Sequence, residues 1–226
     1  MTRESRRTPI RWARPLAVAV LGLLALAVSA WYVAAPAAWS SVAVWASPAA
    51  VRKPAACVAP LAGTQRDIDD EDSPEHPWAH TPGQPIVVYF QTGGLPDRYA
   101  SLVRRAAAIW SRSACVSAVA VDRCPDGARC STVRTNERSR DTDTDGESVG
   151  DDHHGVRRGN AITYYTGELD RSSGNGALAT VVHEMGHALG LVHRNDASDV
   201  MNADTDNGTD PVPDSTDFRN LAVLYG

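Results

Sequence analysis

Residues 181–193 read VVHEMGHALGLVH, and this stretch decides the fold. His183 and His187 lie one helical turn apart, so both imidazoles point from one face of a helix and reach one ion. Gly190 follows where a helix often ends in a left-handed residue, which lets the chain turn back. His193 then approaches the same ion from the other side. Three neutral imidazoles with one open position are typical of catalytic rather than structural zinc.

Glu184 lies next to a ligand but points to its side, so it is free to act as a base. Five fixed positions of this kind recur by chance in a chain of this length about once in 10⁵. The simpler interpretation is a helix whose histidines face solvent or a satisfied core, and it leaves Gly190 and His193 unexplained. The sequence therefore predicts a zinc site.

The motif resembles the extended motif of the metzincin zinc peptidases. Met201, in Ser-Asp-Val-Met-Asn, matches the methionine that the family places in a tight turn beneath the metal. The short link from His193 to Met201 is similar to that of matrixins and of the bacterial snapalysin-type enzymes. Residues 217–226 resemble the closing helix of a matrixin domain. The resemblance implies an α+β fold of the metzincin type, with a twisted, mostly parallel sheet, a long packing helix, an active-site helix and a C-terminal helix.

Some positions depart from that pattern. Arg194 stands where matrixins usually have Ser, and Asn202 and Ala203 stand where they have Pro and Tyr. His193 departs from the Asp that snapalysin-type enzymes generally use. The resemblance therefore implies neither a substrate preference nor one subfamily.

The first 56 residues carry seven Arg or Lys and one Glu, a charge of +6; the whole chain carries −5, so the remainder carries −11. A body this acidic argues against a nucleic-acid partner. We expect three regions. Residues 1–38 form an N-terminal apolar helix, residues 39–84 a disordered Ala/Pro-rich and acidic linker or short pro-segment, and residues 85–226 the catalytic domain.

The N-terminal region is basic over residues 1–14 and apolar from residue 16 onward. Residues 28–30, Val-Ser-Ala, offer a cleavage site for an export signal. The apolar character continues to about residue 38, which is also long enough for a transmembrane anchor. Both interpretations place the remaining chain outside the cytoplasm, either secreted or anchored.

Periodicity predicts the main elements of the domain. Apolar β-branched runs predict buried strands, and apolar residues at helical spacing predict a long helix with Trp110 in the core. The expected elements are strand 86–90, helix 97–113, strand 116–121, strand 161–166, the active-site helix from residue 175 or 176, and a final helix over 215–224 that packs Phe218, Leu221 and Leu224 beneath the active-site helix.

The cysteines form an even set, so we expect disulfides in an exported chain. Cys124 and Cys130 enclose a turn and favour each other, which leaves Cys57 with Cys115.

Asp141, Asp143, Asp145 and Asp152 follow the oxygen-ligand order of a calcium loop. The alternative is a solvated acidic loop, because charge runs usually are solvated. Residues 204–217 are a second acidic candidate for calcium.

These patterns predict an exported zinc endopeptidase with Glu184 as general base and protein or peptide substrates. We expect a monomer, bound to the membrane only if the N-terminal segment is retained. Two alternatives stay open. One is a zinc hydrolase of non-peptide amides or esters, and the other is a catalytically silent, calcium-stabilised surface binding module.

Overall fold

A computed structural model describes residues 56–60, 64–69, 76–138 and 144–226 of the chain. The predicted apolar helix over residues 1–38 lies outside these ranges. Among the helices within them, not one has the length and apolar character needed to cross a membrane. In chain order the elements are β1 (Ile86–Gln91), α1 (Asp97–Trp110), β2 (Val116–Val121), β3 (Cys130–Asn136), β4 (Gly146–His153), β5 (Val156–Tyr165), α2 (Thr166–Leu169), α3 (Gly174–Ala188) and α4 (Ser215–Tyr225).

The five strands form one sheet in the order β2-β1-β3-β5-β4. All neighbours are parallel except β4, which runs antiparallel to β5. In β1 the side chains of Ile86, Val88 and Phe90 alternate into the core, as the period of a half-buried strand requires. The predicted α+β architecture with a mostly parallel sheet is confirmed.

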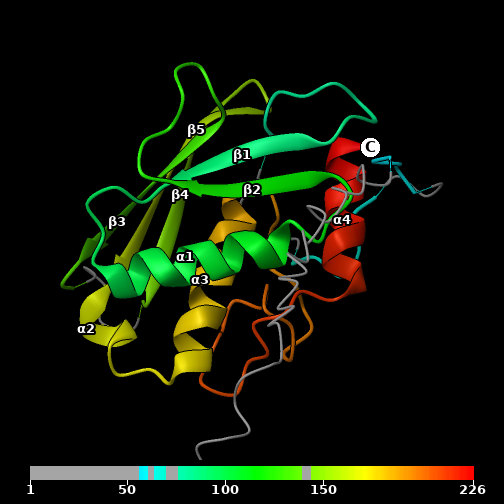
Figure 1. Ribbon diagram of the computed structural model, residues 1–226. Helices are drawn as coiled ribbons and strands as arrows, with labels where there is room; N and C mark the ends of the chain where they lie inside the picture. The colour runs from blue at the N-terminus through cyan, green and yellow to red at the C-terminus, as the bar shows by residue number, and fades with distance from the viewer. Residues whose placement is uncertain (1–55, 61–63, 70–75, 139–143) are drawn as a thin grey trace, which may run out of the picture. The chain divides into compact units, whose positions relative to one another are not determined.

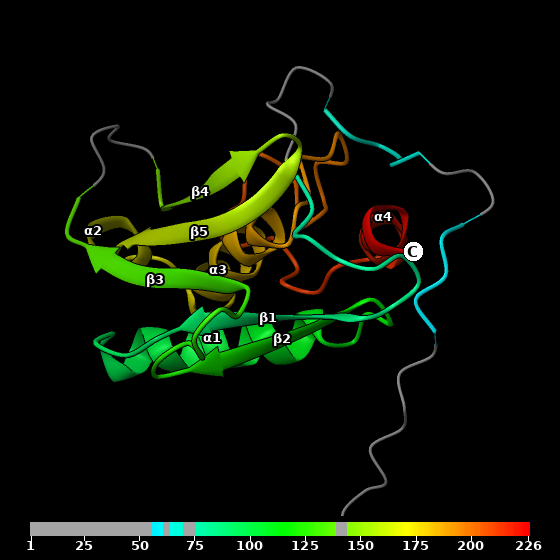
Figure 2. The same ribbon diagram turned by 90° about the horizontal axis from the view of Figure 1, so that it is seen from above.

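Helices α1 and α3 lie on the same face of the sheet, α1 along β1 and β2 and α3 beside it (Figure 1, Figure 2). Trp110, at the end of α1, is fully buried, and its indole nitrogen donates to the carbonyl of Val182 in α3 at 2.9 Å. A buried tryptophan usually finds such a partner for its N–H. The prediction that Trp110 anchors the core is confirmed, and it joins the packing helix to the metal-binding helix.

The final helix, α4, begins with a capping box. The side chain of Asp214 accepts the backbone N–H of Asp217, and the side chain of Asp217 accepts the backbone N–H of Asp214. Its most buried residues are Asp217, Asn220, Leu221 and Tyr225. Leu221 is fully buried, and Phe218 and Leu224 are partly buried and pack against the core, so all three residues of the predicted stripe face the core.

Both predicted disulfides are present. Cys57–Cys115 links residues 56–60 to the start of β2, and Cys124–Cys130 closes the loop before β3.

The expected disordered linker over residues 39–84 is wrong for the residues that the structure describes. Cys57 and Trp78 are each 1% exposed within the core. Residues 64–69, here called the strap, pair with two other segments of the chain. Arg66 exchanges two hydrogen bonds with the side chain of Asn220, at 2.9 and 3.0 Å, and Ile68 pairs with Arg194. The folded unit therefore starts well before residue 85.

Candidate metal centre

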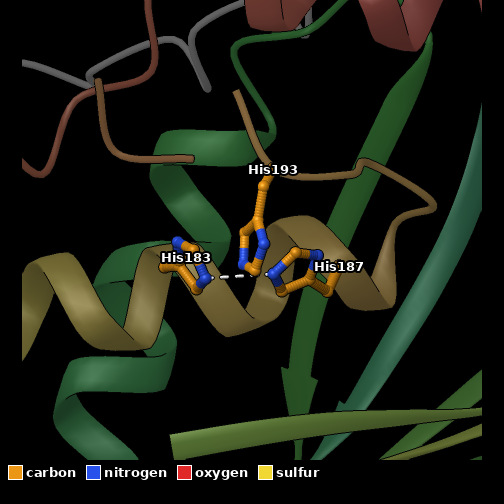
Figure 3. A group of neighbouring side chains, drawn as sticks. All are labelled: His183, His187 and His193. Atoms are coloured by element: carbon orange, nitrogen blue, oxygen red, sulfur yellow. Dashed lines mark hydrogen bonds between the residues drawn. The ribbon is translucent and has the colours of Figure 1, made fainter. Parts of the chain in front are cut away.

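Helix α3 presents two histidines from one face, and a turn brings the third. The Nε2 atoms of His183 and His187 lie 3.0 Å apart, and Figure 3 shows the ring of His193 entering between them. One nitrogen from each of the three rings lies within 4.8 Å of the other two. Gly190 has a φ of +95°, the left-handed conformation that the sequence predicted after the helix. The predicted convergence of the three imidazoles is therefore observed.

The hydrogen bonds of these rings show that a cation fits between them. Nδ1 of His183 lies 2.8 Å from the carbonyl of Val200, and Nδ1 of His187 lies 2.8 Å from the carbonyl of Leu191. A carbonyl only accepts, so Nδ1 carries the proton in both rings and Nε2 presents a lone pair. A cation bound by both nitrogens would account for two lone pairs that face each other at 3.0 Å. Two nitrogens bound to one zinc ion lie about 3.3 Å apart, which is close to this spacing.

Both rings are also held in the neutral state that metal binding needs. Burial lowers the pKa of His183 to about 4, an effect partly opposed by the carbonyl of Val200. Burial and the neighbouring imidazoles lower the pKa of His187 well below its usual range. His183 and His187 are therefore neutral nitrogen donors at neutral pH, and such donors suit zinc.

Glu184 shares a cavity of about 380 Å³ with the three histidines. Burial, together with the carboxylates of Glu147 and Asp145, raises the pKa of Glu184 to about 8. A divalent cation on the imidazoles opposes that shift, because an opposite charge favours the carboxylate. Gly146 of β4 gives Glu184 its space: a Cβ at Gly146 would lie 2.9 Å from the Cγ of Glu184.

Arg157 of β5 closes the end of α3. Its side chain is buried, and Nη1 donates to the carbonyl of His187, where a positive charge complements the helix dipole. Nε and Nη2 donate to the carboxylate of Asp152 at 3.0 and 3.1 Å. Gly150 leaves room for the guanidinium, since a Cβ there would lie 2.4 Å from Nη2 of Arg157. These contacts of Arg157 fix the turn of α3 that carries His187. The sequence pattern did not predict this role of Arg157.

Two aromatic side chains hold the next two carbonyls of the same helix end. The indole nitrogen of Trp78 donates to Ala188 at 2.8 Å, and the hydroxyl of Tyr225 donates to Leu189 at 2.7 Å. Last-turn carbonyls have no partner within their own helix. Side chains from distant parts of the chain therefore fix the point at which the chain turns towards His193.

Met201 is fully buried. Gly186 of α3 packs against it so closely that a Cβ at Gly186 would lie 2.3 Å from the sulfur of Met201 and 2.9 Å from the ring of Trp110. The methionine is thus held against the helix that carries two of the ligands, in the place that the resemblance implied.

Replacing Gly186 by Ala is expected to destabilise the protein. Alanine gains about 1 kcal/mol in helix propensity, but overpacking a buried site costs about 1–3 kcal/mol, and here two fully buried side chains must move. Thermal unfolding of the metal-free protein measures the change. Gly174→Ala in the first turn of α3 is the control, because an added Cβ there meets nothing within 4 Å. Equal stability of the two variants would contradict this packing.

The calcium-loop interpretation is wrong for Asp152. Residues 146–153 form strand β4, and the Asp152 carboxylate is paired with Arg157. Six residues of strand lie between Asp145 and Asp152, which puts the two roughly 23 Å apart, so they cannot share an ion. Asp141 and Asp143 lie outside the described residues, and their predicted role stays a prediction.

The family comparison agrees with this geometry. Residues 98–226, more than half of the chain, match the matrixin family. The chain belongs to the matrixin family. Matrixins are zinc-dependent metallopeptidases, so this matrixin is a zinc metallopeptidase, and its three-histidine centre fits the catalytic zinc of the family. No curated protein matches the chain.

Proposed function

We propose that this matrixin is an exported endopeptidase that cleaves extended peptide segments, with His183, His187 and His193 as zinc ligands and Glu184 as general base. The observation that carries the proposal is the single cavity in which three converging imidazoles and one carboxylate that is not a ligand face the same space. Zinc bound there polarises a carbonyl and acidifies water.

The protein residues divide the remaining work. Glu184 accepts the proton of the attacking water and passes it to the departing amine, which needs a carboxylate within hydrogen-bond reach of both. Gly146 keeps that carboxylate unobstructed. Met201 packs against α3 at Gly186 and takes no part in proton transfer.

Strand β4 supports a peptide substrate. It is the edge strand of the sheet, and Gly146, Glu147 and Ser148 line the cavity of the metal centre. An edge strand presents backbone donors and acceptors that an extended peptide pairs with. A peptide placed along β4 would bring its backbone carbonyl to Glu184 and the imidazoles.

Export is supported by the N-terminal basic and apolar pattern and by the two disulfides, since disulfides persist in oxidising compartments. Whether the N-terminal segment is cleaved or retained decides only between a secreted and an anchored enzyme.

Removal of zinc is expected to abolish activity. The full chain is produced in a host with an intact export pathway, and culture fluid, membranes and cytoplasm are compared by casein zymography with and without a chelator. We expect chelator-sensitive clearing outside the cytoplasm, restored by added zinc, and about one zinc ion per chain. Small amides and esters are tested in parallel. Cleavage of these without casein or gelatin would replace the endopeptidase with a non-peptide hydrolase, and bound zinc without any turnover would favour a binding module.

A further inference from the structure

Arg194 follows the third zinc ligand directly and lies inside the protein, with its side chain 4% exposed. Nη1 of Arg194 donates to Asp199 at 2.6 Å, to Asp214 at 2.9 Å and to Asp217 at 3.2 Å. Nε and Nη2 donate to one oxygen of Asp67 at 3.2 and 2.9 Å. One guanidinium therefore binds carboxylates from three segments: the strap, the turn before Met201 and the start of α4.

The strap also pairs with the backbone on either side of Arg194. The N–H of Asp69 donates to the carbonyl of His193 at 2.9 Å, and the N–H of Asn195 donates to the carbonyl of Asp67 at 3.1 Å. The side chain of Asn195 donates to the carbonyl of Ile68 at 2.7 Å. The backbone that carries the third ligand is thus held as one strand of a short antiparallel pair.

The turn at Met201 holds the same backbone from the other side. The N–H of Arg194 donates to the carbonyl of Met201, and the side chain of Asn202 donates to the carbonyl of Arg194, both at 2.9 Å. Asp199 links this turn to the guanidinium, because its second oxygen accepts the N–H of Met201 at 2.8 Å.

The two carboxylates at the start of α4 have a second task as well. Asp214 accepts the N–H groups of Thr216 and Asp217, and Asp217 accepts the N–H of Asp214. Asp199, Asp214 and Asp217 lie close enough to hold a cation together, and the guanidinium of Arg194 is the cation that they hold. The expectation that residues 204–217 bind calcium is wrong for Asp214 and Asp217, because Arg194 and the helix cap already use both.

We propose that Arg194 is the positioning residue of the zinc centre: by joining the strap, the Met201 turn and α4, it fixes the backbone from which His193 reaches the metal. This inference rests on the proposed zinc function. The strap is then a permanent part of the enzyme and not a pro-segment that is removed on activation. Lysine cannot replace Arg194, because an ammonium group lacks the planar fork of donors that spans four carboxylates.

The test compares Arg194→Lys with Arg158→Lys, a matched change at an exposed arginine of β5. Asp67→Asn is a milder second variant: it keeps the size and the left-handed backbone of Asp67, which has a φ of 54° and which Asn tolerates, but removes the charge that pairs the strap with Arg194. Zinc affinity is measured by competition with a chelating dye, and ligand geometry by the visible absorption of the cobalt-substituted protein. Peptide hydrolysis supplies kcat and KM.

For Arg194→Lys we expect about a 10-fold or greater loss of zinc affinity, a changed cobalt spectrum and a lower kcat with KM little altered. Asp67→Asn should shift the same measurements in the same direction by a smaller factor, and Arg158→Lys should match the wild type. Wild-type affinity and spectrum in a folded Arg194→Lys protein would overturn the proposal. If that variant does not fold, wild-type values in Asp67→Asn would overturn it. A wild-type chain that binds neither zinc nor cobalt would instead refute the proposed function.

Discussion

Glu184→Gln is expected to retain zinc and to lower kcat/KM for peptide hydrolysis by about 10²- to 10⁴-fold, the usual contribution of a general acid–base residue. The amide has almost the same shape as the carboxylate but accepts no proton from water. Glu184 is not one of the grouped ligand residues, so the three imidazoles keep their nitrogens directed at the metal. The loss should therefore appear in the chemical step and not in metal content.

The same substitution is not expected to weaken the fold. Burial and two neighbouring carboxylates raise the pKa of Glu184 to about 8, so its charged form is unfavourable in the metal-free protein and a neutral side chain relieves that cost. Zinc quantitation, steady-state kinetics and thermal unfolding are measured on the same preparation. Glu137→Gln is the matched control, because Glu137 is exposed and does not line this cavity. Full residual activity in Glu184→Gln would refute the assignment of the base.

Removing the disulfide between Cys57 and Cys115, by changing both residues to Ser, is expected to lower the free energy of unfolding by about 4 kcal/mol. The bond closes a loop with a sequence separation of 58, and the entropy that a cross-link removes from the unfolded chain grows with loop length. Both cysteines are also almost fully buried, so the serine hydroxyls enter an apolar core. Denaturant unfolding measures the change.

The second disulfide provides the comparison. Cys124–Cys130 has a sequence separation of only six, so its removal is expected to cost about 2 kcal/mol. The informative result is which of the two disulfides lowers the free energy of unfolding more when it is removed. A larger loss for the short loop would mean that residues 56–60 contribute little to the stability of the folded unit.

The parts of the fold predicted from the sequence are those with strong local signals. Strand β1 and helix α1 have clear apolar periods, and the zinc ligands with Gly190 sit at spacings fixed by helix geometry. Each of these signals lies within a few residues of the chain, so no tertiary information was needed to interpret it.

Strands β3 and β4 were not predicted, because these segments become strands only by pairing with neighbouring strands. The sequence of β4, GESVGDDH, has two glycines and three acidic residues, and only one of its residues is buried. Such a segment becomes a strand only because β5 supplies an antiparallel partner. Local propensity is a weak guide for edge strands of this kind.

The buried arginines could not be assigned from the sequence for a related reason. Arginine is seldom buried unless it is paired. The partners of Arg157 and Arg194 include Asp152, Asp67 and Asp217, and two of the three belong to acidic stretches that indicated calcium or solvent. The departure at Arg194 from the usual matrixin residue was visible in the sequence, but its four carboxylate partners were not.

The bond between Cys57 and Cys115 also determines what happens when the backbone is cut. The proposed exported endopeptidase would be exposed to its own activity, and a single hydrolysis event anywhere between these two residues would leave both fragments covalently joined. The strap would stay linked to the catalytic body, either through this disulfide or through the uncut backbone. On a gel without reductant, such a nicked enzyme would migrate as one intact species.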